Sequence, residues 1–265
     1  MTAGERDILV RITEAARQRL AQQAPPTDLE SRARDAAAKG GGARRRSLHA
    51  ALVQPGVRVI AECKRRSPSK GWLHEPFDPA RLSRAYEAGG AAALSVVTEP
   101  EFFAGEAGWV PLLRREVRLP VMQKDFFLGP RQLFEATLLG ADAVLLIARI
   151  LPGEALAEML ALAAELGLEA LVEVHDEGDL DRVLAVTAPL EGVNARDLRT
   201  FGVDREAAAE LAAGVPADRV AVLESGIGGP ADVATLVERG FRRFLVGEHL
   251  VRSGDPRAAL AELLA

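Results

Sequence analysis

Short apolar runs recur along most of this chain and alternate with segments of helical periodicity. The runs are Val57–Ala61, Ala92–Val97, Val121–Gln123, Ala143–Ile147, Ala170–Val174, Leu190–Val193, Val220–Leu223 and Phe244–Val246. Polar or glycine-rich positions follow each of them. Continuous apolar runs of this length are typical of parallel strands that are buried on both faces. The segments between them include Pro79–Ala88, Pro130–Leu139, Gly153–Leu166 and Pro230–Arg239, which we expect to be helices.

The alternation of strands and helices predicts the fold class. Eight such units fit a single α/β domain, a (β/α)8 TIM barrel, in which each strand is followed by a helix. The alternative is a doubly wound open sheet, but no G-x-G-x-x-G follows the first strand. Several predicted helices end at glycine, as at Gly89-Gly90, Gly140 and Gly167. Glycine at this position is typical of a left-handed helix cap.

Residues 1–46 differ from the repeating units. Ile8–Gln23 has the pattern of an amphipathic helix and stops before Pro25-Pro26, where a helix cannot easily continue. Ser31–Arg46 is charged and contains three successive glycines, and we expect a helical arm followed by a flexible connector there. The sequence therefore predicts an N-terminal helical extension over residues 1–46 and a barrel domain over residues 47–265.

Composition excludes several classes of function. The 265 residues carry 33 Lys and Arg against 38 Asp and Glu, a net charge of −5, whereas a nucleic-acid-binding surface needs a basic excess. No apolar run approaches the length of a membrane span, and the charged N-terminus does not resemble a signal peptide. Cys63 is the single cysteine, so no disulfide can form within the chain. These features predict a cytoplasmic protein.

Lysine is rare in this chain. Of the 33 basic residues only Lys39, Lys64, Lys70 and Lys124 are lysines, and the rest are arginines. Arginine cannot release its proton near neutral pH, whereas lysine can. A lysine that remains in such a chain is therefore a candidate for a position where a proton must be given up.

In a (β/α)8 barrel the active site lies at the carboxyl ends of the strands. Three carboxylates, two lysines and the only asparagine follow the predicted strands in this sequence: Glu62, Lys64, Lys124, Glu173, Asn194 and Glu224. Charged groups that point into a barrel are costly unless they are paired or functional. The alternative is a structural ion-pair network, but the convergence favours a catalytic site.

Two further turns suggest an anion site. Ser225-Gly226-Ile227-Gly228-Gly229 precedes a helix that Pro230 opens, and Gly247 follows the last strand. Backbone N–H groups at such turns bind phosphate. A carboxylate beside phosphate would be repelled, so we expect the Glu248 side chain to turn away and only its N–H to face the ligand.

Other chemistries find no support in the sequence. The four histidines, His49, His74, His175 and His249, have no metal-ligand spacing, and we expect each to be exposed or bonded locally. We therefore expect neither a metal nor a cofactor. Cys63 lies between Glu62 and Lys64, so its thiol should face the helix layer rather than the barrel interior.

Six ordered segments carry a resemblance to a known family. They read AECKRRSPSKG at 61–71, LSVVTE at 94–99, KDF at 124–126, LVEVH at 171–175, GVNARDL at 192–198 and ESGI at 224–227. Because of these six segments, the chain from about Leu48 to its end resembles the indole-3-glycerol phosphate synthases of tryptophan biosynthesis. That resemblance implies a carboxy-lyase that converts 1-(2-carboxyphenylamino)-1-deoxyribulose 5-phosphate into indole-3-glycerol phosphate by ring closure, decarboxylation and dehydration.

The resemblance also implies roles for single residues. Lys124 would donate to the ketone oxygen during ring closure, where negative charge develops. Glu173 would be the base, while Lys64 and Glu62 would be the second acid and its partner. Glu224 would hold a lysine in position, and Asn194 and Ser225 would orient polar atoms. The expected substrate-binding residues are Ser67, Gly226, Gly247 and Glu248 around phosphate, Arg196 at the carboxylate, Phe103, Phe126 and Leu145 against the aromatic ring, and Leu198.

Two other functions are compatible with the predicted fold. A phosphosugar isomerase such as phosphoribosylanthranilate isomerase would need an Asp and a Cys as its acid–base pair, and Cys63 is expected to face the wrong way. A non-catalytic binder of phosphorylated ligands would not need the Lys, Glu and Asn ring. We therefore predict an enzyme with a small phosphorylated substrate, without nucleic-acid or membrane partners, as a monomer or a weak homo-oligomer.

Overall fold

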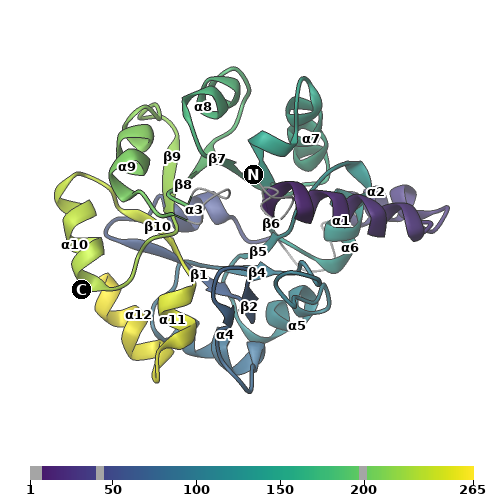
Figure 1. Cartoon of the computed structure of the whole chain (residues 1–265). Coiled ribbons are helices and arrows are strands. Elements are labelled where there is room, and N and C mark those ends of the chain that lie inside the picture. The colour runs from purple at the N-terminus through teal and green to yellow at the C-terminus, as the bar shows by residue number, and fades with distance from the viewer. Residues whose placement is uncertain (1–7, 40–44, 197–201) are drawn as a thin grey trace, which may run out of the picture.

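A closed barrel of parallel strands forms the centre of the protein (Figure 1). The structure is a computed structural model and describes residues 8–39, 45–196 and 202–265. Within these residues eight strands close in the order β1-β10-β9-β8-β7-β6-β5-β4. Their bounds are β1 Arg58–Cys63, β4 Ala93–Val97, β5 Val121–Lys124, β6 Ala143–Ile147, β7 Glu169–Val174, β8 Leu190–Asn194, β9 Val220–Glu224 and β10 Arg243–Val246. The predicted (β/α)8 barrel is therefore confirmed.

Helices surround the strands as an outer layer (Figure 1). They are α4 Pro79–Ala88, α5 Trp109–Glu116, α6 Pro130–Leu139, α7 Ala155–Glu165, α8 Glu177–Leu184, α9 Arg205–Ala213, α10 Pro230–Glu238, α11 Glu248–Arg252 and α12 Pro256–Leu264, with a 3-10 turn, η1, at Ala148–Ile150. The four helices expected from periodicity are all present. The expected glycine caps also hold, because Gly90, Gly140 and Gly167 have φ of 94°, 82° and 71°.

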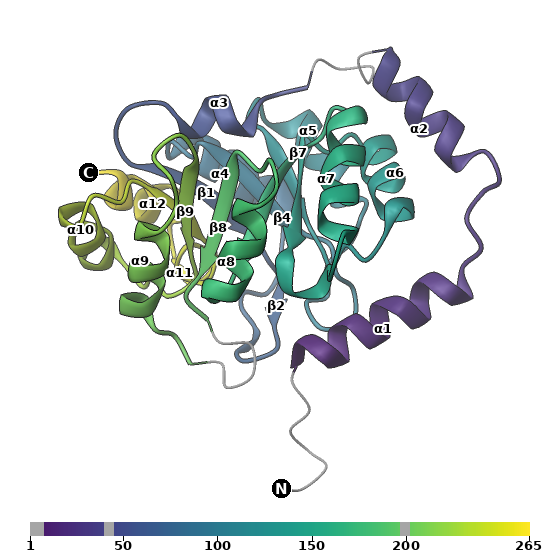
Figure 2. The same cartoon turned by 90° about the horizontal axis from the view of Figure 1, so that it is seen from above.

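Two apolar clusters follow from the alternation of side chains along each strand. The outer cluster lies between strands and helices and includes Val59, Ala61 and Cys63. The inner cluster fills the barrel and includes Ile60, Met122 and Leu171, together with Leu48 of helix α3 (Leu48–Leu52). Figure 2 shows α3 at one end of the barrel, and α1 (Ile8–Gln22) and β2 (Arg66–Ser67) at the other. Because α3 closes the amino end of the strands, a pocket can open only at their carboxyl end.

The N-terminal extension contains two helices. Helix α1 covers Ile8–Gln22, as expected. Helix α2 covers Leu29–Ala38, where the sequence analysis expects a helical arm. Leu29 and Ala33 are one helical turn apart and both are buried in the outer cluster with Phe134 of α6. This apolar contact, supported by the Arg34–Glu30 ion pair at 2.9 Å, stabilises a helix in a segment that is mostly charged.

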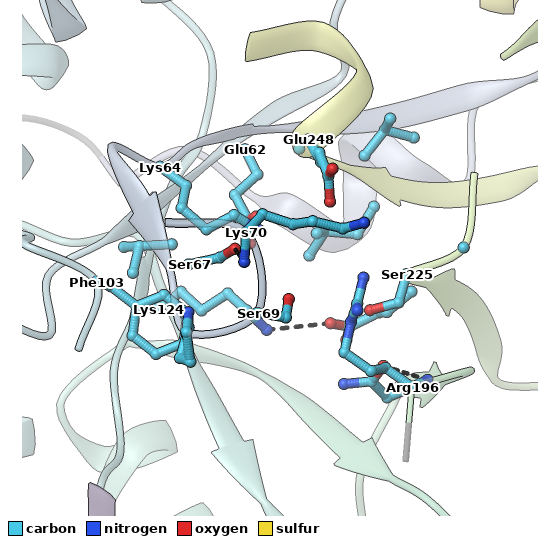
Figure 3. A pocket seen from close by; sticks show the side chains of 18 of the residues that line it. Glu62, Lys64, Ser67, Ser69, Lys70, Phe103, Lys124, Arg196, Ser225 and Glu248 are labelled. Atoms are coloured by element: carbon cyan, nitrogen blue, oxygen red, sulfur yellow. Dashed lines mark hydrogen bonds and ion pairs between the residues drawn. The ribbon is translucent and has the colours of Figure 1, made fainter. Parts of the chain in front are cut away.

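A small antiparallel hairpin, which the sequence analysis does not predict, follows β1. Strand β2 (Arg66–Ser67) pairs with β3 (Gly71–Trp72). Gly71 has φ of 67°, a left-handed conformation that favours glycine. The hairpin carries Ser67, Ser69 and Lys70 to the carboxyl end of the barrel, where Figure 3 shows them beside the pocket.

Candidate active site

One large pocket opens at the carboxyl end of the strands. It has a volume of about 1250 Å³, and Ile8, Leu9 and Ile12 of α1 form part of its wall. The structure brings together the following predicted site residues in its lining: Glu62, Lys64, Ser67, Phe103, Lys124, Phe126, Leu145, Glu173, Asn194, Arg196, Glu224, Ser225, Gly226, Gly247 and Glu248. Leu198, also predicted, lies outside the described residues. Side chains from separate strand ends thus share one cavity (Figure 3).

Lys124, the last residue of β5, lies between two buried carboxylates. Its Nζ donates to Oε2 of Glu173 and to Oε2 of Glu224, each at 3.1 Å. The side chains of the two glutamates are only 3% and 2% exposed. Burial lowers the pKa of the Lys124 ammonium, but Glu224, Glu173 and Glu62 outweigh burial and raise that pKa above its ordinary value. Lys124 is therefore a charged donor aimed into the pocket.

The pKa values of the two carboxylates beside Lys124 are shifted in opposite directions. Burial raises the pKa of Glu173, but Lys124 and His175 outweigh burial and lower the pKa below its usual range. Burial also raises the pKa of Glu224, and there the attraction of Lys124 does not compensate, so its pKa stays raised. Two neighbouring carboxylates whose pKa values are pushed apart are typical of a site with assigned acid and base roles.

A second lysine–carboxylate pair lies at the end of β1. Lys64 Nζ donates to Oε1 of Glu62, whose side chain is 3% exposed. Burial raises the pKa of Glu62, but Lys64 and Lys124 outweigh burial, so the net shift is downward. Glu62 therefore stays ionised and holds Lys64 at the pocket. Of the three lysines that line the pocket, Lys64 and Lys124 are thus each fixed by a carboxylate.

Two glycines make room for these carboxylates. A Cβ on Gly192 in β8 would collide with Oε1 of Glu224, and a Cβ on Gly247 would collide with Oε1 of Glu62. The sequence analysis assigns Gly247 to the phosphate site. The closeness of Glu62 is a second, steric reason for a glycine at this position. Gly192 was missed altogether, because a glycine inside a strand has no chemistry that a sequence pattern can recognise.

The β9–α10 turn has a fixed shape. Ser225 adopts φ of 65°, which is strained for a residue other than glycine, and Gly226 adopts φ of 77°. Oδ2 of Asp232 accepts the Gly228 N–H at 2.7 Å, and Arg205 donates to the Gly226 carbonyl at 3.1 Å. These contacts hold the turn that the sequence analysis identifies as a phosphate site.

Comparisons with known proteins decide the family. A family model described as indole-3-glycerol phosphate synthase matches residues 9–263. The chain belongs to the indole-3-glycerol phosphate synthase family. A relative of that name in Rhodococcus jostii (strain RHA1) is 45% identical over 81% of this chain and 80% of its own length. Another, in Mycobacterium ulcerans (strain Agy99), is 48% identical over 81% and 79%.

Solved structures that resemble this member of the indole-3-glycerol phosphate synthase family confirm the fold. A thiamine phosphate pyrophosphorylase from Pyrococcus furiosus has a TM-score of 0.61 at 18% identity and covers 82% of this chain and 96% of its own. A 3-hexulose-6-phosphate synthase has a TM-score of 0.62 at 15% identity and covers 78% and 97%. At such identities the likeness shows the barrel fold alone.

In this member of the indole-3-glycerol phosphate synthase family, part of the pocket wall is apolar. The rings of Phe103 and Phe126 lie 6.2 Å apart between centroids and are tilted by 35°. Leu145 is buried and belongs to the inner cluster, so it packs in the core and lines the pocket at the same time. Ile8 and Ile12 of α1 complete this apolar part of the wall. The α1 contribution was missed because the extension precedes the repeating units by many residues.

Polar residues also line the pocket. Oδ1 of Asn194 accepts the backbone N–H of Arg196 at 3.0 Å, which fixes the end of β8. Oγ of Ser67 accepts the Lys70 N–H at 3.2 Å and closes the tip of the hairpin. Oε1 of Glu248 lies 3.5 Å from Nε of Arg252, so its charge is partly offset along α11. Polar groups from several loops therefore line the pocket.

Glu99 and Arg19 also support the site, and the sequence analysis does not select them. Glu99 is 1% exposed and accepts the backbone N–H groups of Glu101, Phe102 and Phe103 at 3.0, 2.7 and 3.1 Å. Arg19 of α1 lies 3.5 Å from Glu99 and 4.0 Å from Asp125, next to Phe126. Arg19 thus links α1 to both loops that carry the aromatic rings.

Several expectations about other residues can also be checked. Cys63 lies in the outer cluster, as expected, and burial raises the pKa of its thiol. Among the described residues no group of three or more His, Cys, Asp or Glu side chains could hold a metal ion. Within the same residues no helix combines the length and apolar character of a membrane span.

Proposed function

We propose that the Lys124 cluster carries out the reaction of the indole-3-glycerol phosphate synthase family in this chain. In that reaction an aromatic carbon attacks a ketone, carbon dioxide leaves and water is then lost. One observation carries the proposal: Lys124 is a partly buried, charged donor held at 3.1 Å by both Glu173 and Glu224 in a pocket that apolar and polar side chains line.

The first step of the proposed mechanism closes the ring. Attack on the ketone carbon places negative charge on its oxygen, and the Lys124 ammonium stabilises that charge and delivers the proton. Carbon dioxide then leaves, and its bonding electrons restore the conjugated system. Glu224 keeps Lys124 directed at the pocket throughout.

The second step removes water. Glu173, whose pKa is lowered, is ionised and accepts the proton from the anilino nitrogen side of the intermediate. Lys64, held by Glu62, protonates the departing hydroxyl. Lys124 protonates the ketone oxygen when the ring closes, and Lys64 protonates the same oxygen when it leaves as water. Two steps that each need a releasable proton give a reason for lysine rather than arginine at these two positions.

The pocket offers a distinct place to each part of the substrate. Phe103, Phe126 and Leu145 contact the aromatic ring, and Arg196 pairs with its carboxylate in fork geometry. The phosphate lies among the following residues: Ser67, Gly226, Gly247 and the backbone N–H of Glu248. Asn194 and Ser225 orient the polar chain between these two ends.

Turnover of 1-(2-carboxyphenylamino)-1-deoxyribulose 5-phosphate, followed by indole fluorescence, tests this function. We expect steady fluorescence growth with the purified chain and none with Lys124→Ala. Binding of the substrate without fluorescence growth would instead support the non-catalytic binder. Isomerisation of phosphoribosylanthranilate would support the isomerase, which the outward-facing Cys63 disfavours.

The domain division and the assembly belong to the same proposal. Residues 1–46 form an extension on a barrel domain of residues 47–265, and the protein works in the cytoplasm as a monomer or a weak homo-oligomer. Light scattering on a size-exclusion column measures the assembly directly, and a stable large oligomer would contradict it.

A further inference from the structure

His175 lies next to the catalytic cluster but has no role in the mechanism above. It follows β7 two positions after Glu173, so the two side chains share one face of the strand. Its side chain is only 3% exposed. Nε2 lies 3.1 Å from Oε1 of Glu173, an ion-pair distance although not aligned as a hydrogen bond. A histidine buried against a catalytic base needs an explanation beyond local bonding.

Asp179 lies behind the imidazole. Its Oδ2 is 3.7 Å from Nδ1 of His175 and also accepts the backbone N–H of His175 at 3.2 Å. Asp179 itself is held by Arg182 at 2.8 Å and by Arg149 at 3.3 Å, and its pKa is lowered to about 2 despite burial. A carboxylate therefore stands on each side of the ring, Glu173 from β7 and Asp179 from α8.

These neighbours determine the charge of the ring. Burial lowers the pKa of His175 and Arg149 opposes protonation too, but Asp179 and Glu173 outweigh both and raise the pKa to about 9. The ring is therefore an imidazolium at neutral pH, and both nitrogens are donors. Since the pKa in the folded state exceeds the ordinary 6.5, this stabilisation is complete below pH 6.5 and is lost as the pH rises through about 9.

The consequence for Glu173 follows from its two oxygens. Oε2 faces the Lys124 ammonium and Oε1 faces His175. With a cation at each oxygen the carboxylate is ionised and has one orientation, although it is buried. Lys124 alone would leave Oε1 without a charged partner, and Glu224 shares that same ammonium.

We infer that His175 is a positioning residue for the reaction: as an imidazolium backed by Asp179, it holds the carboxylate of Glu173 in one orientation and in its ionised state. The inference rests on the proposed role of Glu173 as the base. It adds a second cation beside Glu173, so that Lys124 faces Oε2 and His175 faces Oε1 of this carboxylate.

The test compares His175→Ala and His175→Gln with the wild type over a range of pH. Alanine removes the donor and the charge, whereas glutamine keeps a donor only. We expect kcat to fall by about 10- to 100-fold in His175→Ala and by less in His175→Gln, with KM within about threefold, because misplacement of a catalytic group acts mainly on the chemical step. In both variants the pKa of Glu173 should rise, because the carboxylate loses a neighbouring cation. The acid limb of the pH profile of kcat/KM should therefore move to higher pH.

Two controls separate this inference from simpler explanations. His74→Gln changes an exposed histidine outside the pocket and should leave rate and pH profile unchanged. Asp179→Asn keeps the imidazole but removes the charge behind it, so the acid limb should move in the same direction by a smaller amount. A lower melting temperature with the wild-type pH profile in every variant would overturn the inference and show a packing role only.

A direct titration does not depend on how the variants fold. The imidazole of His175 in the wild-type protein can be followed by nuclear magnetic resonance, and we expect it to stay protonated through pH 8. A neutral ring at pH 7 would overturn the inference. Failure of the proposed function is distinct from both results, because the wild type would then show no indole fluorescence at all.

Discussion

At the scale of single residues, the site depends on charges that compensate one another out of water. Glu62, Glu173 and Glu224 are each at most 3% exposed, and an unpaired carboxylate so deeply buried would cost several kcal/mol. Lys64 and Lys124 offset this cost and keep two of the three glutamates ionised. Removal of one cation therefore changes the protonation of its neighbours as well as the rate.

Lys124→Arg is the sharpest test of the proposed proton donor. Arginine keeps the charge but holds its proton too tightly, and its planar group does not fit between two carboxylates that both lie 3.1 Å from one nitrogen. We expect kcat to fall by about 100-fold or more. Steady-state rates from indole fluorescence measure the loss.

Lys124→Ala is the control for that substitution. It should lose at least as much activity, while binding of a product analogue to both variants stays within about tenfold of the wild type. A Lys124→Arg enzyme with nearly wild-type turnover would show that Lys124 supplies charge only. The proton donor would then have to be Lys64.

Gly192→Ala tests whether a bare backbone in β8 is needed for catalysis. The added Cβ would meet Oε1 of Glu224 and push that carboxylate away from Lys124. We expect kcat to fall by about 100-fold, the typical effect of moving a catalytic group by about 1 Å. Gly254→Ala is the matched control, because nothing lies within 4 Å of a Cβ there. Equal kcat in the two variants would contradict this role for Gly192.

At the scale of elements, the N-terminal extension is built onto the barrel at both ends. Arg46 donates to the carbonyls of Val117 and Leu119, each at 2.8 Å, on the side of the barrel closed by α3. At the other side α1 contributes Ile8 and Ile12 to the pocket. All eight barrel strands nevertheless lie between Arg58 and Val246 in the described chain, so no strand depends on the extension for its pairing.

Deletion of residues 1–46 should therefore leave a folded barrel with weaker substrate binding. The barrel keeps its sheet, loses the Arg46 contacts and some stability, and opens the apolar side of its pocket to water. We expect KM to rise by about tenfold or more, in line with the loss of two or three buried apolar side chains from the binding wall. Circular dichroism checks the fold, and an unfolded truncation would refute the domain division.

Periodicity predicted the elements well wherever one face of a segment is continuously apolar. Ala143–Ile147 and Pro130–Leu139 were predicted with the bounds observed. The bounds of helix α2 were not predicted, because only Leu29 and Ala33 are buried and their partner Phe134 lies about a hundred residues away. Reactive residues at strand ends were predicted because each can be recognised from the strand that precedes it in the sequence. Gly192 and Arg19 were missed because their roles exist only once distant segments meet.

At the scale of the whole molecule, the proposed catalytic cluster and the proposed phosphate site come from different elements around one pocket. The lysines and carboxylates come from β1, β5, β7 and β9, whereas the glycine-rich turn precedes α10 and Gly247 precedes α11. The turn is held by the Asp232 side chain and by Arg205, which themselves pair at 2.5 Å. If this turn binds the phosphate as proposed, the anion site is formed before substrate arrives and does not depend on the bonds that rearrange.

Removal of the substrate phosphate should therefore raise KM far more than it lowers kcat. A preformed site binds substrate and transition state equally, and its loss removes uniform binding. Two or three hydrogen bonds to a charged group correspond to an increase in KM of about 100-fold or more, and we expect kcat to change by less than about tenfold. The measurement is a comparison of 1-(2-carboxyphenylamino)-1-deoxyribulose with its 5-phosphate by indole fluorescence. Equal activity on both compounds would contradict the phosphate site, and a loss confined to kcat would show that phosphate binding is used to position the reacting carbons instead.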